Sequence, residues 1–200
     1  MAKPMRQSAL WGHFTEGRFG AQQPREMGIE LAERRPPGIA QINGAPEAAA
    51  LTAALGDFGL ETTPVSNRSC RGTRATLLWN GPGMWLVESP DVDSPGLLHE
   101  LRSALAQTDA TVTDLSHART IVRVRGARAP ELLCKGCPAD IQALATGDCL
   151  VTQLAHFSVM MHSIDGAQGV DLYVFRSFGL ALWEWLSGAA EEFGYRVVGQ

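Results

Sequence analysis

The chain has 200 residues, of which 45% are apolar and only 19% are charged, below the usual fraction of about a quarter. This deficit of charge favours a subunit whose surface is partly covered by other chains. The net charge of −4 argues against a nucleic-acid partner, and no apolar run approaches the roughly 20 residues that span a membrane.

The N-terminal sequence lacks the apolar core of a signal peptide, so we expect a cytoplasmic protein with reduced cysteines. Residues 1–38 are expected to form an extended, irregular segment. It contains Trp11, Phe14 and Phe19, whereas solvated tails usually lack aromatic residues. The segment is therefore expected to contact a partner, and the alternative that it folds back on its own domain stays open.

Residues 39–115 are expected to form a first structural repeat. It comprises a strand at 38–43, a helix at 45–55, a hairpin at 76–88 with its turn at 80–83, a helix at 94–105 and a strand at 110–115. Ser94 is the expected N-cap of the second helix, followed by Pro95 at its first position.

Residues 118–198 are expected to form a second, similar repeat. Its elements are a strand at 120–125, a helix at 129–135, strands at 150–154, 157–163 and 170–175, a helix at 177–192 and a strand at 195–198. Both repeats follow the ferredoxin-like order β-α-β-β-α-β. We therefore expect residues 39–200 to form a single duplicated α+β domain.

A Cys-x-x-Cys pair, Cys134 and Cys137, suggests a zinc site, a redox pair or a structural element. Zinc needs about four ligands, but Cys70 and Cys149 are isolated. A redox pair is expected at the start of a helix, whereas this pair lies at the end of one, before Pro138. The structural interpretation is favoured, and Cys134, which follows two leucines, is expected to be the more buried thiol.

His156 and His162 are expected on one face of a strand, about 20 Å apart, too far to share a metal ion. The residues between them that face the other way, Phe157, Val159 and Met161, are expected in the core.

The sequence from Asp114 to Arg119 contains the residue types of a hydrolytic triad. Neighbouring residues on a strand point to opposite faces, so Ser116 and His117 are not expected to form a proton relay.

A row of cations is expected on one face of the strand that follows. It consists of His117, Arg119, Arg123 and Arg125. Three interpretations stay open for this row: it binds an anionic ligand such as a folate glutamate tail, it pairs with acidic residues of a partner, or it is merely solvated.

The last helix is expected to carry one apolar face into the core. That face comprises Phe178, Leu182, Trp185, Leu186, Ala189 and Phe193. Trp183 lies at its edge and is a candidate interface residue, because tryptophan is enriched where subunits meet.

Several motifs resemble the gamma subunit of heterotetrameric sarcosine oxidase. They are GPGMWLVE, DLSHARTIVRVRG, LLCKGCPADI, LAHFSVMMH and DLYVFRSFGLALWEWL. The resemblance extends from about Met27 to Val198 and is most specific at residues 112–186. It implies a fold related to the aminomethyltransferase, or T-protein, of the glycine cleavage system.

The resemblance also implies a function. The family's assembly oxidises sarcosine to glycine, transfers the one-carbon unit to tetrahydrofolate and produces hydrogen peroxide. FAD, FMN, NAD, tetrahydrofolate and zinc are expected on the alpha, beta and delta subunits, which are the expected partners. No catalytic, cofactor-binding or metal-binding residue is expected on this chain.

Two alternatives stay open. One is the small subunit of N-methylglutamate dehydrogenase, which is similar to the gamma subunit. The other is an independent folate-dependent aminomethyltransferase-like protein, which the implied fold and the arginine row on one strand face favour. A third similarity, to T-protein-like proteins of iron–sulfur cluster maintenance, loses its support. In those proteins Lys-Gly-Cys is followed by an aromatic residue and Gly-Gln-Glu, whereas here Pro138-Ala139-Asp140 follows.

Overall fold

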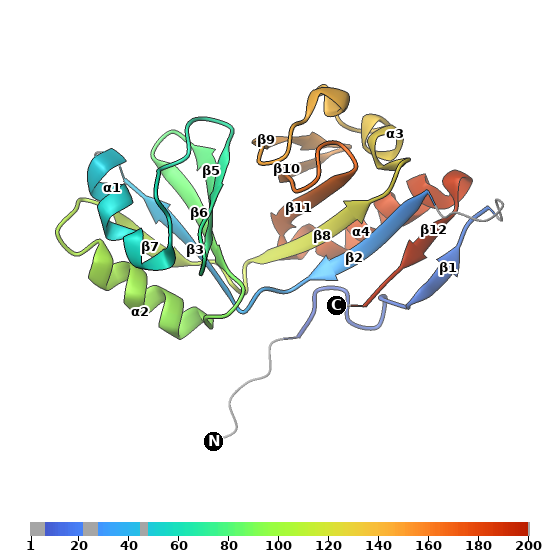
Figure 1. Cartoon of the computed structure of the whole chain (residues 1–200). Helices are drawn as coiled ribbons and strands as arrows, with labels where there is room; N and C mark the ends of the chain where they lie inside the picture. The colour runs from blue at the N-terminus through green and yellow to red at the C-terminus, as the bar shows by residue number, and fades with distance from the viewer. Residues whose placement is uncertain (1–6, 22–27, 45–47, 200) are drawn as a thin grey trace, which may run out of the picture. The chain divides into compact units, whose positions relative to one another are not determined.

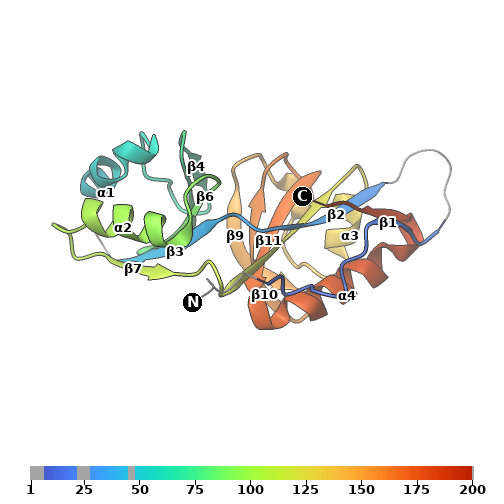
Figure 2. The same cartoon turned by 90° about the horizontal axis from the view of Figure 1, so that it is seen from below.

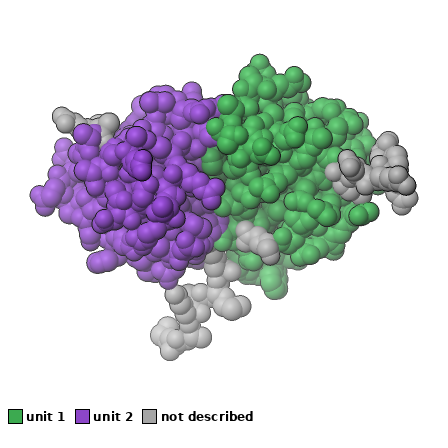
Figure 3. All heavy atoms as spheres, viewed as in Figure 1, with its two compact units in different colours: residues 1–35, 119–146, 152–200 green, residues 36–118, 147–151 purple. Residues whose placement is uncertain are grey.

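The computed structural model describes residues 7–21, 28–44 and 48–199, and the chain forms two compact units (Figure 3). Unit 1 contains residues 1–35, 119–146 and 152–200, and unit 2 contains residues 36–118 and 147–151. Each predicted repeat contributes to a sheet of its own, and the single duplicated domain expected over residues 39–200 stays a prediction. Among the described residues, no helix is both long and apolar enough to cross a membrane.

Unit 2 corresponds to the first predicted repeat. Its elements are β3 (Gly38–Asn43), α1 (Ala48–Ala54), the 3₁₀ turn η1 (Gly56–Phe58), β4 (Ser69–Arg71), β5 (Thr76–Gly81), β6 (Met84–Ser89), α2 (Ser94–Ala104) and β7 (Thr111–Asp114) (Figure 1). The sheet order is β4-β5-β6-β3-β7, with antiparallel neighbours. Apart from the short β4, this is the predicted ferredoxin-like arrangement. Residues 45–47, the predicted start of the first helix, lie outside the described residues.

The core of unit 2 lies between its sheet and its two helices, which cover the same face of that sheet (Figure 1). The N-cap of helix α2 lies one residue earlier than predicted. This N-cap is Asp93, whose Oδ1 accepts a hydrogen bond from Gly96 N at 3.1 Å. Ser94 is not the cap, because its hydroxyl donates instead to Asp114 Oδ2 at 2.6 Å.

Unit 1 contains the second predicted repeat together with N-terminal residues. Its helices and turns are α3 (Ala129–Cys134), η2 (Ile141–Ala143), η3 (Arg176–Phe178), α4 (Gly179–Ala190) and η4 (Glu191–Phe193). The second sheet consists of β1 (Gly17–Phe19), β2 (Ile29–Arg34), β8 (Arg119–Arg125), β9 (Cys149–Leu154), β10 (Phe157–Ser163), β11 (Gly169–Phe175) and β12 (Tyr195–Val197). Their order is β1-β12-β2-β8-β11-β10-β9.

Strand β2 corrects the expectation that residues 1–38 are irregular. It lies inside the second sheet, antiparallel to β8 and parallel to β12, with Leu31 opposite both Val124 and Val197. Ile29 and Leu31 are fully buried. Strand β2 lies between β8 and β12 in the sheet order, where its apolar side chains are covered by the core and its backbone pairs on both sides.

Residues 7–21 also fold back on unit 1, where they follow α4 (Figure 2). Leu10 is fully buried, the rings of Phe14 and Trp183 lie 5.3 Å apart, and Ala21 N donates to Glu191 O at 2.7 Å. Of the two open interpretations, folding back on its own domain is confirmed for these residues. Contact with a partner stays a prediction. Trp11, which is 71% exposed, is the residue of this segment that is available for such a contact.

Candidate functional site

The Cys-x-x-Cys pair lies at the end of α3, but its thiols are not buried in the predicted order. Cys134 is exposed, whereas Cys137 is only 9% exposed. The expectation that Cys134 is the more buried thiol is wrong, because α3 ends there and the next turn, in which Cys137 N donates to Leu133 O at 3.0 Å, brings Cys137 inside. Both thiols are free, and the described residues contain no group of three or more His, Cys, Asp or Glu that could hold a metal.

Gly136, between the two cysteines, is required by close packing. A Cβ atom at this position would lie 2.7 Å from Cζ2 of Trp185 and 2.9 Å from the backbone nitrogen of Ala155. Its carbonyl accepts a hydrogen bond from that same nitrogen at 2.8 Å. The motif therefore joins the end of α3 to α4 and to the turn before β10.

Arg123, in the middle of the predicted cationic row, is already neutralised. Its Nε and Nη2 donate to the two carboxylate oxygens of Asp171 at 2.6 and 2.7 Å. Arg34 Nη1 donates to the same carboxylate at 2.8 Å, and the Asp171 side chain is only 1% exposed. This ion cluster joins β2, β8 and β11, so the row is not an open series of cations for an anionic ligand.

The other two arginines of β8 differ from Arg123. The guanidinium carbon of Arg119 lies 4.0 Å from the ring centroid of Phe175, a cation–π contact. Its Nε is buried without a hydrogen-bond partner among the described residues, and burial lowers the pKa of Arg119 from its usual value. Arg125, at the far end of the strand, is exposed.

The sequence with triad residue types is structural, as expected. The Ser116 hydroxyl accepts a hydrogen bond from Ile39 N at 2.9 Å and donates one to Ile39 O at 3.1 Å. Burial alone would raise the pKa of Asp114, but hydrogen bonds from Ser94 and Ser116 and the nearby His117 together lower it. These contacts fix the end of β7 on β3 and leave no relay from serine to histidine.

The two histidines do not lie on one strand. Strand β10 begins at Phe157, so His156 lies in the preceding turn, exposed, with its ring 4.0 Å from that of Phe157. His162 lies on β10 and is half-buried. The expected core positions of Phe157, Val159 and Met161 are confirmed.

The last helix differs from its prediction at several residues, since Trp185, Ala189 and Phe193, expected in the core, are only half-buried. Leu182 and Leu186 are fully buried as expected, but Phe178 is 49% exposed, because it precedes α4 in the turn η3. Trp183 was expected at an interface and is buried instead, only 5% exposed, beneath Phe14 of the N-terminal segment.

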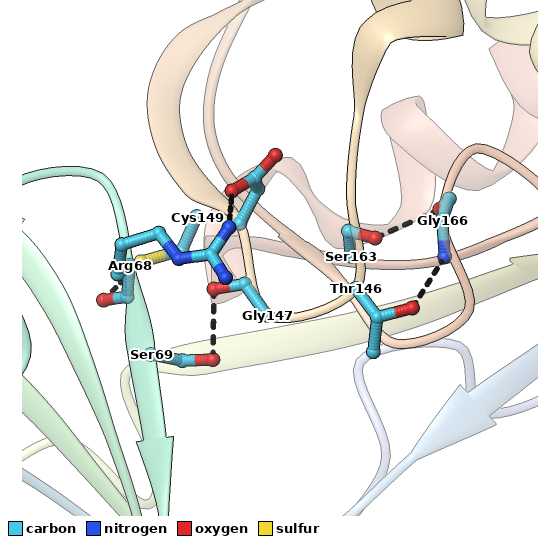
Figure 4. Close-up of polar contacts among 8 residues, drawn as sticks. Arg68, Ser69, Thr146, Gly147, Cys149, Ser163 and Gly166 are labelled. Atoms are coloured by element: carbon cyan, nitrogen blue, oxygen red, sulfur yellow. Dashed lines mark hydrogen bonds and ion pairs between the residues drawn. The ribbon is translucent and has the colours of Figure 1, made fainter.

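Figure 4 shows the hydrogen bonds that fix the loop before β9. In unit 2, Arg68 forms an ion pair with Asp148, and Ser69 Oγ donates to Gly147 O at 3.0 Å. The Cys149 thiol donates to Arg68 O at 2.9 Å and Trp79 O at 3.3 Å. Burial raises the pKa of Cys149 to about 11, so its thiol stays protonated at neutral pH and is a poor nucleophile.

Both units contain hollows of similar volume among their described residues. A hollow in unit 1, about 510 Å³, is lined by Ser8, Leu10, Trp11, Gly12, Phe14, Glu16, Glu33, Arg35 and Gly199. One hollow in unit 2, about 500 Å³, is lined by Ser94, Pro95, Leu98, His99, Arg102, Ser103 and Asp114. Another, about 520 Å³, is lined by Asp57, Phe58, Arg74, His99, Glu100, Ser103 and Ala104. None of these three contains the arginines of β8 or the cysteine pair, so the predicted site residues do not surround them.

Comparison with known proteins identifies the family. The model described as "Sarcosine oxidase, gamma subunit family" matches residues 43–192. The chain belongs to this family. The gamma subunit from Corynebacterium sp. (strain P-1) is 32% identical over 171 residues, which are 84% of this chain and 82% of that protein. The gamma subunit from Arthrobacter sp. is 34% identical over 134 residues, 66% of this chain and 64% of that protein.

Solved structures agree with this membership. A chain of the heterotetrameric sarcosine oxidase from Corynebacterium sp. U-96, in complex with pyrrole 2-carboxylate, superimposes with a TM-score of 0.75 and 26% identity over 88% of both chains. The glycine cleavage system aminomethyltransferase T from Bartonella henselae superimposes with a TM-score of 0.67 and 14% identity, covering 86% of this chain and 48% of that protein. This second similarity shows the fold alone, and it confirms the predicted aminomethyltransferase-like architecture.

Sequence reasoning missed Asp171, the central residue of the arginine cluster. It lies 48 residues from Arg123 in the sequence, and only the pairing of β11 with β8 places the two side by side. The predicted strands at 120–125 and 170–175 could have indicated this contact. Pairing them as antiparallel neighbours would have placed an acidic residue beside the row of basic residues.

Proposed function

We propose that this chain is the gamma subunit of a heterotetrameric sarcosine oxidase and that its role in the complex is structural. The main support is the superposition on a chain of the Corynebacterium heterotetramer over 88% of both chains. The complex would convert sarcosine, oxygen and tetrahydrofolate into glycine, methylenetetrahydrofolate and hydrogen peroxide. The four free cysteines are in keeping with a complex that acts in the cytoplasm.

The proposal assigns the chemistry to the alpha, beta and delta subunits, which would carry FAD, FMN, NAD, tetrahydrofolate and zinc. The supporting observations are local. Arg123 is bound by Asp171, the Ser116 hydroxyl by the Ile39 backbone, and the Cys149 thiol by two carbonyl groups. These three side chains are thus engaged in holding the fold together.

Co-expression with the alpha, beta and delta chains tests this proposal. We expect one particle on size-exclusion chromatography that contains all four chains, has flavin absorbance and releases peroxide when sarcosine is added. The isolated chain should show neither property. A particle that assembles fully from the other three chains and turns over sarcosine at the same rate without this chain would contradict the structural role.

A panel of N-methyl amino acids added to the purified complex defines the substrate. Sarcosine should give the highest kcat/KM. A complex that prefers N-methylglutamate would instead place the chain in a dehydrogenase of that substrate.

A further inference from the structure

The hollow in unit 1 is formed mainly by residues 8–16, part of the segment that sequence analysis expected to contact a partner. Within this segment, Leu10 is fully buried, and its carbonyl oxygen accepts hydrogen bonds from His13 N at 2.9 Å and Phe14 N at 3.0 Å. Trp11 lies inside this hydrogen-bonded turn and is nevertheless 71% exposed. The fold thus holds a large apolar side chain in contact with water on the wall of a cavity of about 510 Å³, here called the Trp11 hollow.

The apolar wall of the Trp11 hollow is fixed by the core of unit 1. Phe14 also lines the hollow, and its ring centroid lies 5.3 Å from that of the buried Trp183. The exposure of Trp11 leaves the hollow open on one side, whereas sites for small molecules enclose most of their ligand. The hollow therefore favours a group carried on another protein surface, and exposed tryptophan is a residue on which such interfaces often depend.

Two carboxylates and one guanidinium group line the Trp11 hollow. Glu33, on β2, is only 8% exposed, and its Oε2 accepts a hydrogen bond from Ser8 Oγ at 2.6 Å. Arg35 Nε lies 4.0 Å from the same oxygen, and the Arg35 side chain is 46% exposed. Because this long contact is well solvated, it is weak. Arg35 therefore offsets at most one of the two negative charges of the hollow.

Glu16 supplies the second carboxylate, and its side chain is exposed. A Cβ atom at Gly199 would overlap Oε1 of Glu16, which places this carboxylate against the wall that Gly199 forms. Among the described residues, no donor or cation binds the Glu16 side chain. The hollow thus presents an accessible carboxylate without a partner, together with the exposed indole of Trp11.

The group that complements these features is a cation on an apolar stem. A carboxylate attracts the charge, and tryptophan is the aromatic residue that binds cations best. Arginine and lysine carry such a charge at the end of an apolar chain that packs against apolar walls.

We propose that the Trp11 hollow is the docking site for one basic side chain, arginine or lysine, of a partner subunit. The inference rests on the proposed function, since it assumes that the chain assembles with other chains. The charged end of the basic side chain would pair with Glu16, and its apolar stem would lie against Trp11. The surface around that side chain would then cover the indole.

Binding of variant chains to the alpha, beta and delta chains tests the site. Binding of the wild-type chain is measured first, so that a failure of the proposed function is seen on its own. Trp11→Ala should weaken binding by about tenfold or more. Glu16→Gln should weaken it by about threefold, since the pair is partly solvated, and Glu16→Lys by about tenfold or more, since like charges then meet. Because both residues are exposed, the melting temperature of each isolated variant should stay unchanged.

Phe178→Ala and Glu184→Gln are the matched controls, because both replace exposed residues elsewhere on unit 1. They should change binding by less than about twofold, as most contacts outside an energetic centre do. If the wild-type chain assembles and Trp11→Ala and Glu16→Gln bind equally well, the docking site is overturned while the proposed function stands. An equal loss in the two controls would overturn it too, because the effect would not belong to the hollow.

Photo-cross-linking identifies the occupant of the Trp11 hollow. Benzoylphenylalanine in place of Trp11 should cross-link, in the assembled complex, to a partner peptide that contains an arginine or a lysine. Replacing that basic residue by methionine should weaken binding to the wild-type chain but cause no further loss with Glu16→Gln. A cross-link to residues 1–6 of the same chain, or to a second copy of it, would overturn the inference. Micromolar calorimetric binding of butylammonium to the isolated chain, lost in Glu16→Gln, would assign the hollow to a small cation and would also overturn it.

Discussion

The two units differ in how the last strand of each repeat joins its sheet. In unit 2, the last strand of the repeat, β7, pairs directly with the first, β3, and the ferredoxin-like sheet is complete. In unit 1, the equivalent strand β12 is separated from β8 by β2, which comes from the N-terminal residues. The first repeat is thus self-contained, whereas the second depends on a segment that precedes both repeats in the sequence.

This difference also determines where charge is buried. The inserted strand brings Arg34 next to Arg123, and the buried Asp171 joins both of these partly buried arginines in one cluster. In unit 2, the Arg68–Asp148 pair is more exposed, with side-chain exposures of 44% and 24%. The insertion of β2 is therefore fixed by buried charges as well as by apolar packing.

Removal of the inserted strand should have the largest effect. A chain without residues 1–35, or the variant Leu31→Asp, should lose the fold of unit 1, because Ile29 and Leu31 are fully buried in its sheet. The expected loss is on the order of 5 kcal/mol or more, comparable to the stability of a whole domain. Hydrogen exchange should show lost protection in β8 and β11 with protection retained in β3 and β6. Equal loss in both sheets would contradict the asymmetry between the units.

Asp171→Ala should destabilise the protein by about 3 kcal/mol, because it removes the buried carboxylate that two partly buried guanidinium groups share. Asp148→Ala, the control in unit 2, should cost about 1 kcal/mol or less, since its arginine is well solvated. Urea denaturation of the two variants measures both values. Similar costs would show that β2 is held by apolar contacts alone.

High pH should weaken unit 2 through Cys149. The folded-state pKa of about 11 exceeds the ordinary value of 9.0, so the folded state favours the protonated thiol. The resulting stability is fully present below pH 9 and is lost as the pH rises towards 11, by about 2–3 kcal/mol at most. Thermal melts between pH 8 and 11 should show this decline. Cys149→Ala should have a smaller slope over the same interval, and an unchanged slope would exclude the thiol as its cause.

Gly136→Ala should destabilise unit 1 by about 2 kcal/mol, because the new methyl group would overlap Trp185 and the backbone at Ala155. Gly188→Ala is a matched control on α4, where nothing lies within 4 Å of the new Cβ. It should stabilise the helix by about 0.5–1 kcal/mol. The two variants should shift the melting temperature in opposite directions. A lower melting temperature in both variants would mean that alanine disturbs α4 generally.

The repeats could be predicted from sequence because their elements follow one another along the chain. Strand β2 was missed because its alternation of apolar and polar residues is short. It covers only Ile29 to Leu31, and the next two residues, Ala32 and Glu33, are both buried. Its partner, β8, lies about 90 residues further along the chain, and a local pattern does not show such pairing.

Burial by distant residues explains the remaining errors at the candidate site. Trp183 looks like an interface residue until Phe14 covers it. Arg119 and Arg123 are equivalent in the sequence, and the register that sets Asp171 opposite Arg123 and Phe175 opposite Arg119 makes them different. These contacts depend on which strands pair and in which register, and a local sequence pattern does not show that pairing.

The smallest expected effect concerns the cysteine pair. Cys137→Ser should cost about 1 kcal/mol, because it places a hydroxyl in a buried site where the present sulfur atom lies 3.9 Å from Thr152 Oγ1, too far for a good hydrogen bond from the shorter serine. Cys134→Ser should be nearly neutral, since that thiol is exposed. Chemical denaturation of the single variants gives the difference, which reverses the order expected from sequence. Peroxide production per flavin in the assembled complex should not change in either variant. A loss of that activity at unchanged stability would mean that the pair does more than fill the end of α3.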